Sequence, residues 1–164
     1  MSKTTSDMII KKVALRASRE HVWKAITEAE QFGTWFGVTF DGSFAEGETI
    51  TGKMTPTQVD AEIAKSQEPY TGAHFEIVVE KIEPMHHFSF RWHPYAVEPG
   101  TDYSHEDRTL VTFELEDTEE GTLLTITESG FDGVSLERRA KAFEMNEQGW
   151  EAQTRLIAKY LTDA

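Results

Sequence analysis

Glu128 is the residue whose setting in the sequence could best support chemistry. It continues the alternation of Leu124 and Ile126, so its side chain points inward at the end of a strand pattern, just before a long helical pattern. A buried carboxylate needs a hydrogen-bonding partner or a raised pKa. Three roles follow: it orients a hydroxyl or amine of a ligand, acts as a general base, or accepts hydrogen bonds from amides of residues 130–133.

The histidines are candidate metal ligands. Six are present, but no pair has the HExxH spacing or another helical spacing that binds zinc. His93 and His105 flank a segment that contains Asp102, Glu106 and Asp107, a set of donors that zinc or a hard cation can use. Solvated loop residues explain the same set more simply, so we predict no metal and no cofactor.

Nucleophilic catalysis has no motif to support it. The chain has no cysteine, and the Gly130–Gly133 segment lacks the serine of a nucleophile elbow. No glycine-rich phosphate loop follows a strand pattern. We therefore predict no catalytic residue, and nucleotide binding is not expected.

The charge balance limits the classes of partner. Lysine and arginine number 16 against 29 aspartate and glutamate residues, a formal charge of -13. Such a chain repels phosphate backbones and anionic membrane surfaces, so neither nucleic acid nor membrane is expected to bind. Residues 1–7 lead into a strand pattern without a signal-peptide apolar region, and no membrane span is present, so we predict a cytoplasmic protein.

Apolar side chains, most of them aromatic, are the main candidates for contact with a ligand. They fall on the faces that strand alternation and helical spacing turn inward, and apolar pockets with few polar groups are the usual small-molecule sites. Filling of the core is the simpler explanation for any single ring. The predicted ligand-binding set is Trp35, Phe36, Met54, Phe75, Ile77, Phe88, Phe90, Trp92, Phe113, Glu128, Phe143 and Trp150.

Periodicity predicts the elements that position these side chains. Strands are expected over residues 8–15, 38–40, 48–54, 74–82, 88–92, 109–115 and 123–128. Helices are expected over residues 19–28, 30–36 and 136–161, with Ser18 and Ser135 as N-caps of the first and last. The inner stripe of the last helix is predicted to be Leu136, Ala140, Phe143, Trp150, Ile157 and Leu161.

Two connections stand out from this pattern. Residues 56–71 form a polar stretch in which Val59 and Ile63, four positions apart, can cover something apolar from a short helix; it is a surface loop or a lid. Residues 94–107 form a long irregular connection. The order of elements predicts one α+β domain over residues 1–164, with helices on one face of an antiparallel sheet.

Several short segments, in this order, resemble the family related to the C-terminal domain of the activator of Hsp90 ATPase, a branch of the START-like or Bet v 1-like superfamily. The matching stretches are Val22–Thr27, Trp35–Phe36, Phe88–Pro94, Thr109–Phe113 with Gly121–Thr122, Glu128–Phe131 and Gly149–Trp150. The resemblance implies a helix-grip fold, in which a bent sheet wraps around the last helix and a cavity lies between them.

Three functions are compatible with that resemblance. The first is a binding protein that holds a hydrophobic or aromatic ligand, lipid-like or polyketide-like, between the sheet and the C-terminal helix. The second is a protein-interaction module that acts on an Hsp90-type chaperone. The third is a cyclase or hydrolase in the same cavity, for which Glu128 or His93 would supply the acid–base group.

Overall fold

The computed structural model describes residues 8–95 and 102–163, and its strands form one antiparallel sheet in the order β1-β7-β6-β5-β4-β3-β2. Residues 1–7 and part of the 94–107 connection, including Pro99 and Gly100, lie outside the described residues. The strands are β1 Met8–Leu15, β2 Val38–Phe40, β3 Thr49–Met54, β4 His74–Glu83, β5 His87–Trp92, β6 Thr109–Thr118 and β7 Gly121–Ser129. The helices are α1 Arg19–Thr27, α2 Ala29–Phe36, α3 Ala61–Gln67 and α4 Leu136–Asp163, with 3-10 turns η2 Glu68–Tyr70 and η3 Phe131–Gly133.

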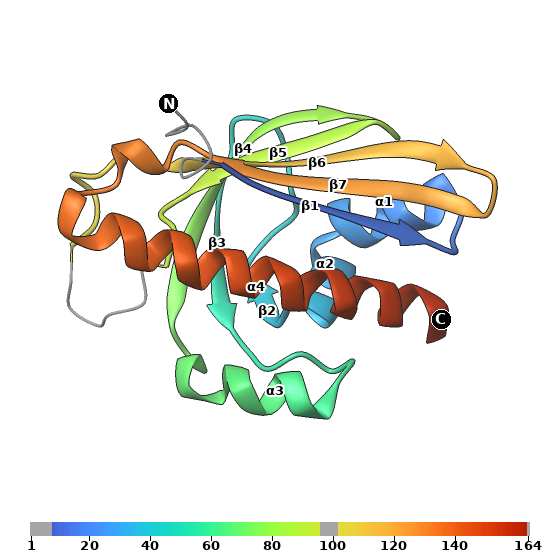
Figure 1. Ribbon diagram of the computed structural model, residues 1–164, viewed down its shortest axis with the longest axis horizontal. Helices are drawn as coiled ribbons and strands as arrows, with labels where there is room; N and C mark the ends of the chain where they lie inside the picture. Colours follow the sequence, from blue (N-terminus) through green and yellow to red (C-terminus); the bar gives the residue numbers. More distant parts are fainter. Residues whose placement is uncertain (1–7, 96–101, 164) are drawn as a thin grey trace.

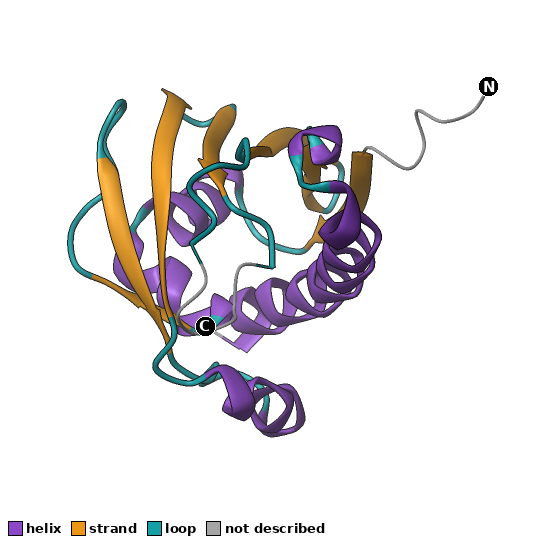
Figure 2. Cartoon of the chain, turned by 90° about the vertical axis from the view of Figure 1, so that its left-hand side faces the viewer, coloured by secondary structure: helices purple, strands orange, loops and turns teal. Residues whose placement is uncertain are grey.

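The sheet is curved, and α4 lies along its concave side. Figure 1 shows α4 running beneath β1, β6 and β7, and Figure 2 shows the strands on an arc with α4 across its open side. The predicted α+β helix-grip fold is therefore confirmed. Helices α1 and α2 lie near one end of α4, whereas α3 stands apart from the other helices (Figure 1).

Strand β7 places Glu128 on the buried face of the sheet, near the end of the strand. It pairs with β1 on one side and β6 on the other, so Glu128 lies opposite Ile9 and Val111. Burial alternates regularly along β7, with Leu124, Ile126 and Glu128 on the inner face. The alternation predicted from the sequence is confirmed, and the Glu128 side chain has 0% exposed surface.

Helix α1 begins where its sequence predicts. The Ser18 side chain accepts a hydrogen bond from the His21 amide, which satisfies one of the unpaired amides of the first turn. Helix α2 ends at Gly37, whose φ of 98° is a left-handed conformation that glycine adopts without strain. Between the two helices, the buried Trp35 indole donates to the Ala25 carbonyl at 2.9 Å.

The inner stripe of α4 differs from the prediction at its first turns. Leu136 is 78% exposed and Ala140 is also exposed, because the start of the helix extends past the end of the sheet (Figure 1). The buried side begins at Ala142 and continues through Trp150, Ile157 and Leu161. The Ser135 hydroxyl donates to the Glu106 carboxylate at 2.7 Å, a bond that the capping prediction did not include.

Two predicted connections also differ in detail. Strands β2 and β3 pair as expected, but residues 41–48 join them, a longer connection than a tight hairpin turn. Within residues 56–71 the short helix that the spacing suggested is present as α3, capped by the Asp60 side chain; Ile63 lies on it, whereas Val59 precedes it. Across residues 8–95 and 102–163, no helix combines the length and apolar character needed to span a membrane.

Candidate functional site

A cavity of about 440 Å³ lies between α4, the β3–β5 part of the sheet, and the α3–η2 segment. Its walls come from segments far apart in the chain. Lysine, arginine, aspartate and glutamate are absent from the described residues that line it. The lining residues are Phe36, Met54, Ile63, Ser66, Gln67, Tyr70, Ala73, His74, Phe75, Trp92, His93, Tyr95, Met145, Asn146, Gln148, Gly149, Trp150, Ala152 and Gln153.

Four aromatic rings form a continuous part of this wall. Trp92 of β5 and Trp150 of α4 have ring centroids 5.9 Å apart, with 31° between their planes. Phe36 lies 6.2 Å from Trp92 and 5.9 Å from Trp150, and Phe75 lies 5.8 Å from Trp92. These spacings are those of attractive aromatic pairs, so the rings hold one another in place as well as enclosing the space.

Glu128 lies behind this aromatic wall and is held by four side chains. The indole N–H groups of Trp92 and Trp150 each donate to its carboxylate at 2.8 Å. The Thr109 hydroxyl donates at 2.6 Å, and the Asn146 amide donates to both oxygens at 3.0 and 3.2 Å. Indole and amide nitrogens only donate, so these partners fit the ionised carboxylate.

The hydrogen-bond partners of Glu128 differ from the backbone amides considered in the sequence analysis. The partners of Glu128 are side chains of β5, β6 and α4 rather than amides of residues 130–133. None of the four donors carries a positive charge. Glu128 itself does not line the cavity, whereas three of its donors, Trp92, Asn146 and Trp150, do.

The rim of the cavity is tied together by a tyrosine pair. The Tyr70 hydroxyl of η2 forms a hydrogen bond with the Tyr95 side chain, and this bond, together with burial, raises the pKa of Tyr70. Tyr95 follows β5 and has a left-handed backbone with φ of 49°, a strained conformation for a residue other than glycine. The pair thus connects the α3–η2 segment to the connection after β5.

Arg138 of α4 fixes that connection in turn. Its guanidinium donates to the Tyr95 and Pro94 carbonyls at 3.0 Å each and forms an ion pair with Glu106 at 2.8 Å. The guanidinium also lies over the Tyr103 ring, 4.6 Å from its centroid. One side chain therefore holds several parts of the rim against the helix.

Glu106 is the acidic partner in this arrangement. Its side chain is only 3% exposed, and it accepts hydrogen bonds from both Arg138 and the Ser135 hydroxyl. The hydrogen bonds from Arg138, followed by those from Ser135, outweigh the effect of burial and lower the pKa of Glu106 to about 2. The ion pair is consequently present over the whole neutral range.

Two glutamine side chains attach the α3 wall and α4 to the end of α2. Gln67 and Gln153 donate their amide groups to the Phe36 carbonyl at 3.2 and 3.1 Å. The carbonyl oxygen of Gln67 accepts from the Thr57 amide at 2.7 Å. The carbonyl oxygen of Gln153 is buried and has no protein partner.

His93 lines the cavity and is its candidate acid–base group. Burial, and secondly the positive charge of Arg108, lower its pKa, so the ring is neutral at pH 7. Its Nδ1 atom is buried without a hydrogen-bond partner. Within the described part of the chain, no group of three or more acidic, histidine or cysteine side chains is arranged to hold a metal ion.

The predicted ligand-binding residues fall into two groups. Phe36, Met54, Phe75, Trp92 and Trp150 line the cavity. The others lie outside its lining: the buried core holds Trp35, Ile77, Phe88, Phe90 and Phe113, Glu128 lies behind the wall, and Phe143 packs on Phe131. Their role in binding stays a prediction.

Several lining residues were not anticipated. Tyr70 and Tyr95 lie in segments without strand or helix periodicity, so their inward direction had no signal in the sequence. Gly149 and Gln153 flank the predicted residue Trp150 on α4, and Gln153 is one helical turn beyond Gly149. That spacing could have identified the face of α4 that borders the cavity.

Comparison with known proteins agrees with the fold. The family model described as Activator of Hsp90 ATPase homolog 1-like protein matches residues 16–162. A protein from Arthrobacter aurescens is similar with a TM-score of 0.73 and 20% identity, over 100% of this chain and 91% of that one. A Mesorhizobium loti protein has a TM-score of 0.70 and 20% identity, over 96% and 98% of the two chains.

A third solved structure carries a more specific name. The Aha1 dimer from Colwellia psychrerythraea has a TM-score of 0.66 and 16% identity, over 94% of this chain and 95% of that chain. At these identities the likeness shows a common fold alone. Comparison with curated proteins found no match.

Proposed function

The chain belongs to the Activator of Hsp90 ATPase homolog 1-like family, and from this premise we propose that it binds a hydrophobic or aromatic small molecule in its cavity. The observation that carries the proposal is the aromatic wall around a space of about 440 Å³, within the range of small-molecule sites. The START-like fold commonly serves ligand binding, and the absence of acidic and basic side chains from the described lining favours an apolar ligand body.

The energy available from this wall is modest. A ligand the size of two fused aromatic rings that loses roughly 300 Å² of apolar surface gains about 7 kcal/mol before the entropy of association is subtracted. We therefore expect dissociation constants in the micromolar range or weaker. Such affinities are measurable by fluorescence titration with a neutral apolar probe such as N-phenyl-1-naphthylamine.

Gly149 offers a way to block the cavity without disturbing the core. It lies on α4 in the cavity lining, and a Cβ atom built there meets no atom within 4 Å. Gly149→Phe should place its ring in the cavity and weaken probe binding by at least tenfold. Gly149→Ala adds helix propensity but little volume, so this control should bind the probe like the wild type and unfold at a slightly higher temperature.

The two variants make the result interpretable. Because neither removes a contact, both should remain folded, as circular dichroism can verify. Equal probe binding by wild type and Gly149→Phe would place the probe elsewhere on the protein and reject the proposed site. Failure of the wild-type chain to bind any of a set of neutral apolar probes would reject the function.

A protein-interaction role is the second candidate, because the description of the matching family model names activation of the Hsp90 ATPase. In this role the acidic chain, with a formal charge of -13, would bind a basic surface of an Hsp90-type chaperone. Stimulation of the ATPase activity of a bacterial Hsp90 by the purified chain would support it. Absence of both association and stimulation would remove it.

An enzymatic role in the same cavity has less support. The carboxylate considered as a general base, Glu128, is engaged by four donors and lies behind the lining. His93 remains as an acid–base group at the cavity, kept neutral by its lowered pKa. Turnover of an aromatic substrate that is lost in His93→Phe would favour this role over simple binding.

A further inference from the structure

The buried carboxylate of Glu128 places a negative charge behind the aromatic wall of the cavity. Glu128 has no exposed surface, and its four hydrogen-bond donors are the neutral side chains of Trp92, Trp150, Thr109 and Asn146. A neutral donor set solvates a carboxylate but does not cancel its charge. The negative charge therefore acts on its surroundings in a region where water screens it little.

The tryptophans transmit this charge to the cavity. An aromatic ring has a negative face, and indole is the side chain that binds cations best through it. Each indole N–H points at the Glu128 carboxylate, and such a hydrogen bond polarises its donor toward higher electron density in the ring. Both polarised rings line the cavity.

The remaining wall does not oppose this potential. Phe36, Phe75, Tyr70 and Tyr95 add further rings, and no lysine or arginine is among the described lining residues. His93 is neutral at pH 7, because burial and Arg108 lower its pKa. Of the cations near the rim, Arg138 is paired with the buried Glu106 at 2.8 Å and Arg108 with Glu76 at 3.6 Å, which offsets their charge. The exposed Lys141 acts on Tyr70 from solvent and is screened there.

We propose that the cavity selects cationic ligands with an aromatic or alkyl body, such as a quaternary ammonium or a protonated amine, over anionic ones of the same size. The inference rests on the proposed binding function and names the ligand class of that same site. It separates amines and heteroaromatic cations from fatty acids and other carboxylates, a distinction that the apolar lining alone does not make.

The test compares three naphthalene probes of nearly equal shape. They are (2-naphthylmethyl)trimethylammonium, its neutral isostere 2-neopentylnaphthalene, and the anion 2-naphthylacetate, each measured by displacement of a neutral fluorescent probe. At 0.5 M NaCl the Debye length is about 4 Å, so attraction to the acidic surface is largely removed. We expect the cation to bind at least tenfold more tightly than the anion, with the neutral probe between them.

Two substitutions assign the selectivity to its source. Glu128→Gln keeps the size and removes the charge, so the cation-to-anion ratio should fall to within about threefold. Glu119→Gln removes one charge from the exposed turn between β6 and β7 and should leave the ratio unchanged. Where Glu128→Gln does not fold, Trp92→Phe keeps a ring but removes one N–H donor, and the ratio should fall about threefold.

The outcomes distinguish this inference from the function on which it rests. Suppose that the fluorescent probe binds to the wild type, that Gly149→Phe blocks it, and that the anion binds as tightly as the cation. The charge selectivity is then wrong and the binding function stands. An unchanged ratio in folded Glu128→Gln also overturns the inference. If the fluorescent probe binds but none of the three naphthalenes displaces it, the charge selectivity is rejected and the binding function stands. If the fluorescent probe and the other neutral apolar probes also fail to bind, both proposals fail together.

Discussion

Trp150 donates its indole N–H to the Glu128 carboxylate at 2.8 Å, and this buried bond joins α4 to β7 at the wall of the cavity. Trp150 is 2% exposed and Glu128 is fully buried, so water cannot replace the bond when it is lost. The same pair therefore has two roles: it attaches the long helix to the sheet, and it forms the back of the candidate binding site.

Replacement of Trp150 should lower the unfolding free energy by more than the loss of a hydrogen bond to a neutral acceptor does. Trp150→Phe leaves the buried carboxylate with one donor fewer, which costs about 1.5–3 kcal/mol of unfolding free energy in addition to lost packing. Trp35→Phe is a matched control, because Trp35 is equally buried but donates to the neutral Ala25 carbonyl. Urea denaturation should show Trp150→Phe to be less stable than Trp35→Phe by about 1 kcal/mol. Equal losses would mean that packing, not the carboxylate, sets the cost.

The ion pair between Glu106 and Arg138 should control stability in acid. The pKa of Glu106 in the folded protein is about 2, below its ordinary value of 4.5. A lowered pKa means that the unfolded chain binds more protons, so this contribution is complete above pH 4.5 and disappears as the pH falls toward 2. The shift corresponds to about 3 kcal/mol. Between pH 4.5 and pH 2 we expect the unfolding free energy of the wild type to fall by about 3 kcal/mol more than that of Glu106→Gln.

The matched control for this measurement is Glu119→Gln, which removes a carboxylate from an exposed turn. Its unfolding free energy should follow the wild-type pH profile between pH 5 and pH 2. Parallel wild-type and Glu106→Gln profiles would show that Glu106 titrates at an ordinary pKa, and would refute the assignment of the ion pair.

The inward direction of Glu128 could be predicted, but its partners could not. Alternation has a period of two along β7, so the parity shared with Leu124 and Ile126 determines which face Glu128 occupies. Its donors come from β5, β6 and α4, at 18 to 36 positions away in the sequence, where local periodicity carries no information. The family resemblance supplied the bent sheet and the cavity, not these pairings.

The sequence also could not predict which inward-facing aromatic residues fill the core and which line the cavity. Trp35 and Trp92 both lie on inward faces, but the first fills the space between helices and the second borders a void. The difference depends on where α3 and η2 lie, and these segments have only partly exposed or exposed side chains. Leu136 is an opposite case, predicted to be buried but exposed. Helical spacing includes it in the predicted inner stripe of α4, but the helix starts beyond the sheet that would cover it.

Gly37 should be intolerant of any side chain. Its φ of 98° is left-handed, and a Cβ atom would lie 2.7 Å from the Gln67 side-chain oxygen and 2.9 Å from the Thr55 carbonyl. Gly47 has a similar φ of 82° with no atom within 4 Å, so Gly47→Ala measures conformational strain alone, about 1 kcal/mol. Gly37→Ala should lose at least 1 kcal/mol more in urea denaturation, because collisions are added to strain. Equal losses would show that both the Gln67 side chain and the Thr55 backbone move aside freely.

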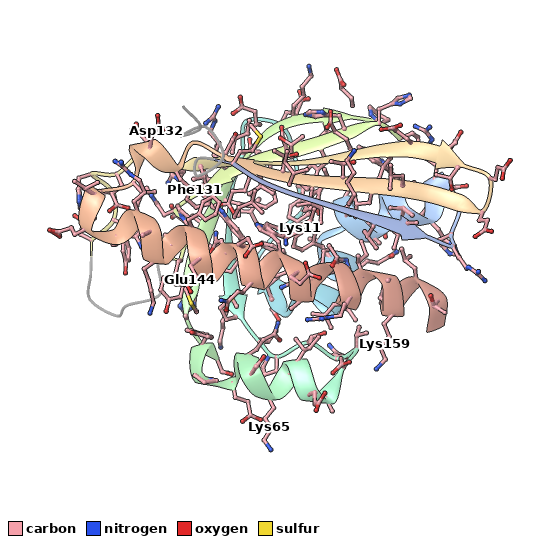
Figure 3. The ribbon with its side chains drawn as sticks, in the orientation of Figure 1. Lys11, Lys65, Phe131, Asp132, Glu144 and Lys159 are labelled. Atoms are coloured by element: carbon pink, nitrogen blue, oxygen red, sulfur yellow. The ribbon has the colours of Figure 1, made fainter. Side chains whose placement is uncertain are left out.

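Helix α3 should be the part of the cavity wall that opens most easily. None of its side chains is buried, and Figure 3 shows Lys65 pointing away from the rest of the protein. Gln67 attaches it by hydrogen bonds, since it donates to the Phe36 carbonyl and accepts from the Thr57 amide, and Ile63 packs against the core while staying partly exposed. A second attachment is the partly exposed ion pair of Asp60 with Lys159 at 3.4 Å, and such pairs contribute little.

Removing the Gln67 side chain should therefore release α3 while leaving the sheet intact. In Gln67→Ala we expect amide hydrogens of α3 to exchange at least tenfold faster, whereas those of β6 and β7 keep their protection, because local opening does not require global unfolding. Ser66→Ala is the control on the same helix, since the Ser66 hydroxyl bonds only to the nearby Ile63 carbonyl. Hydrogen exchange measured by mass spectrometry gives both regions in one experiment. Equal acceleration in α3 and the sheet would mean that Gln67 stabilises the whole fold, and no acceleration would mean that α3 is held by contacts other than this side chain.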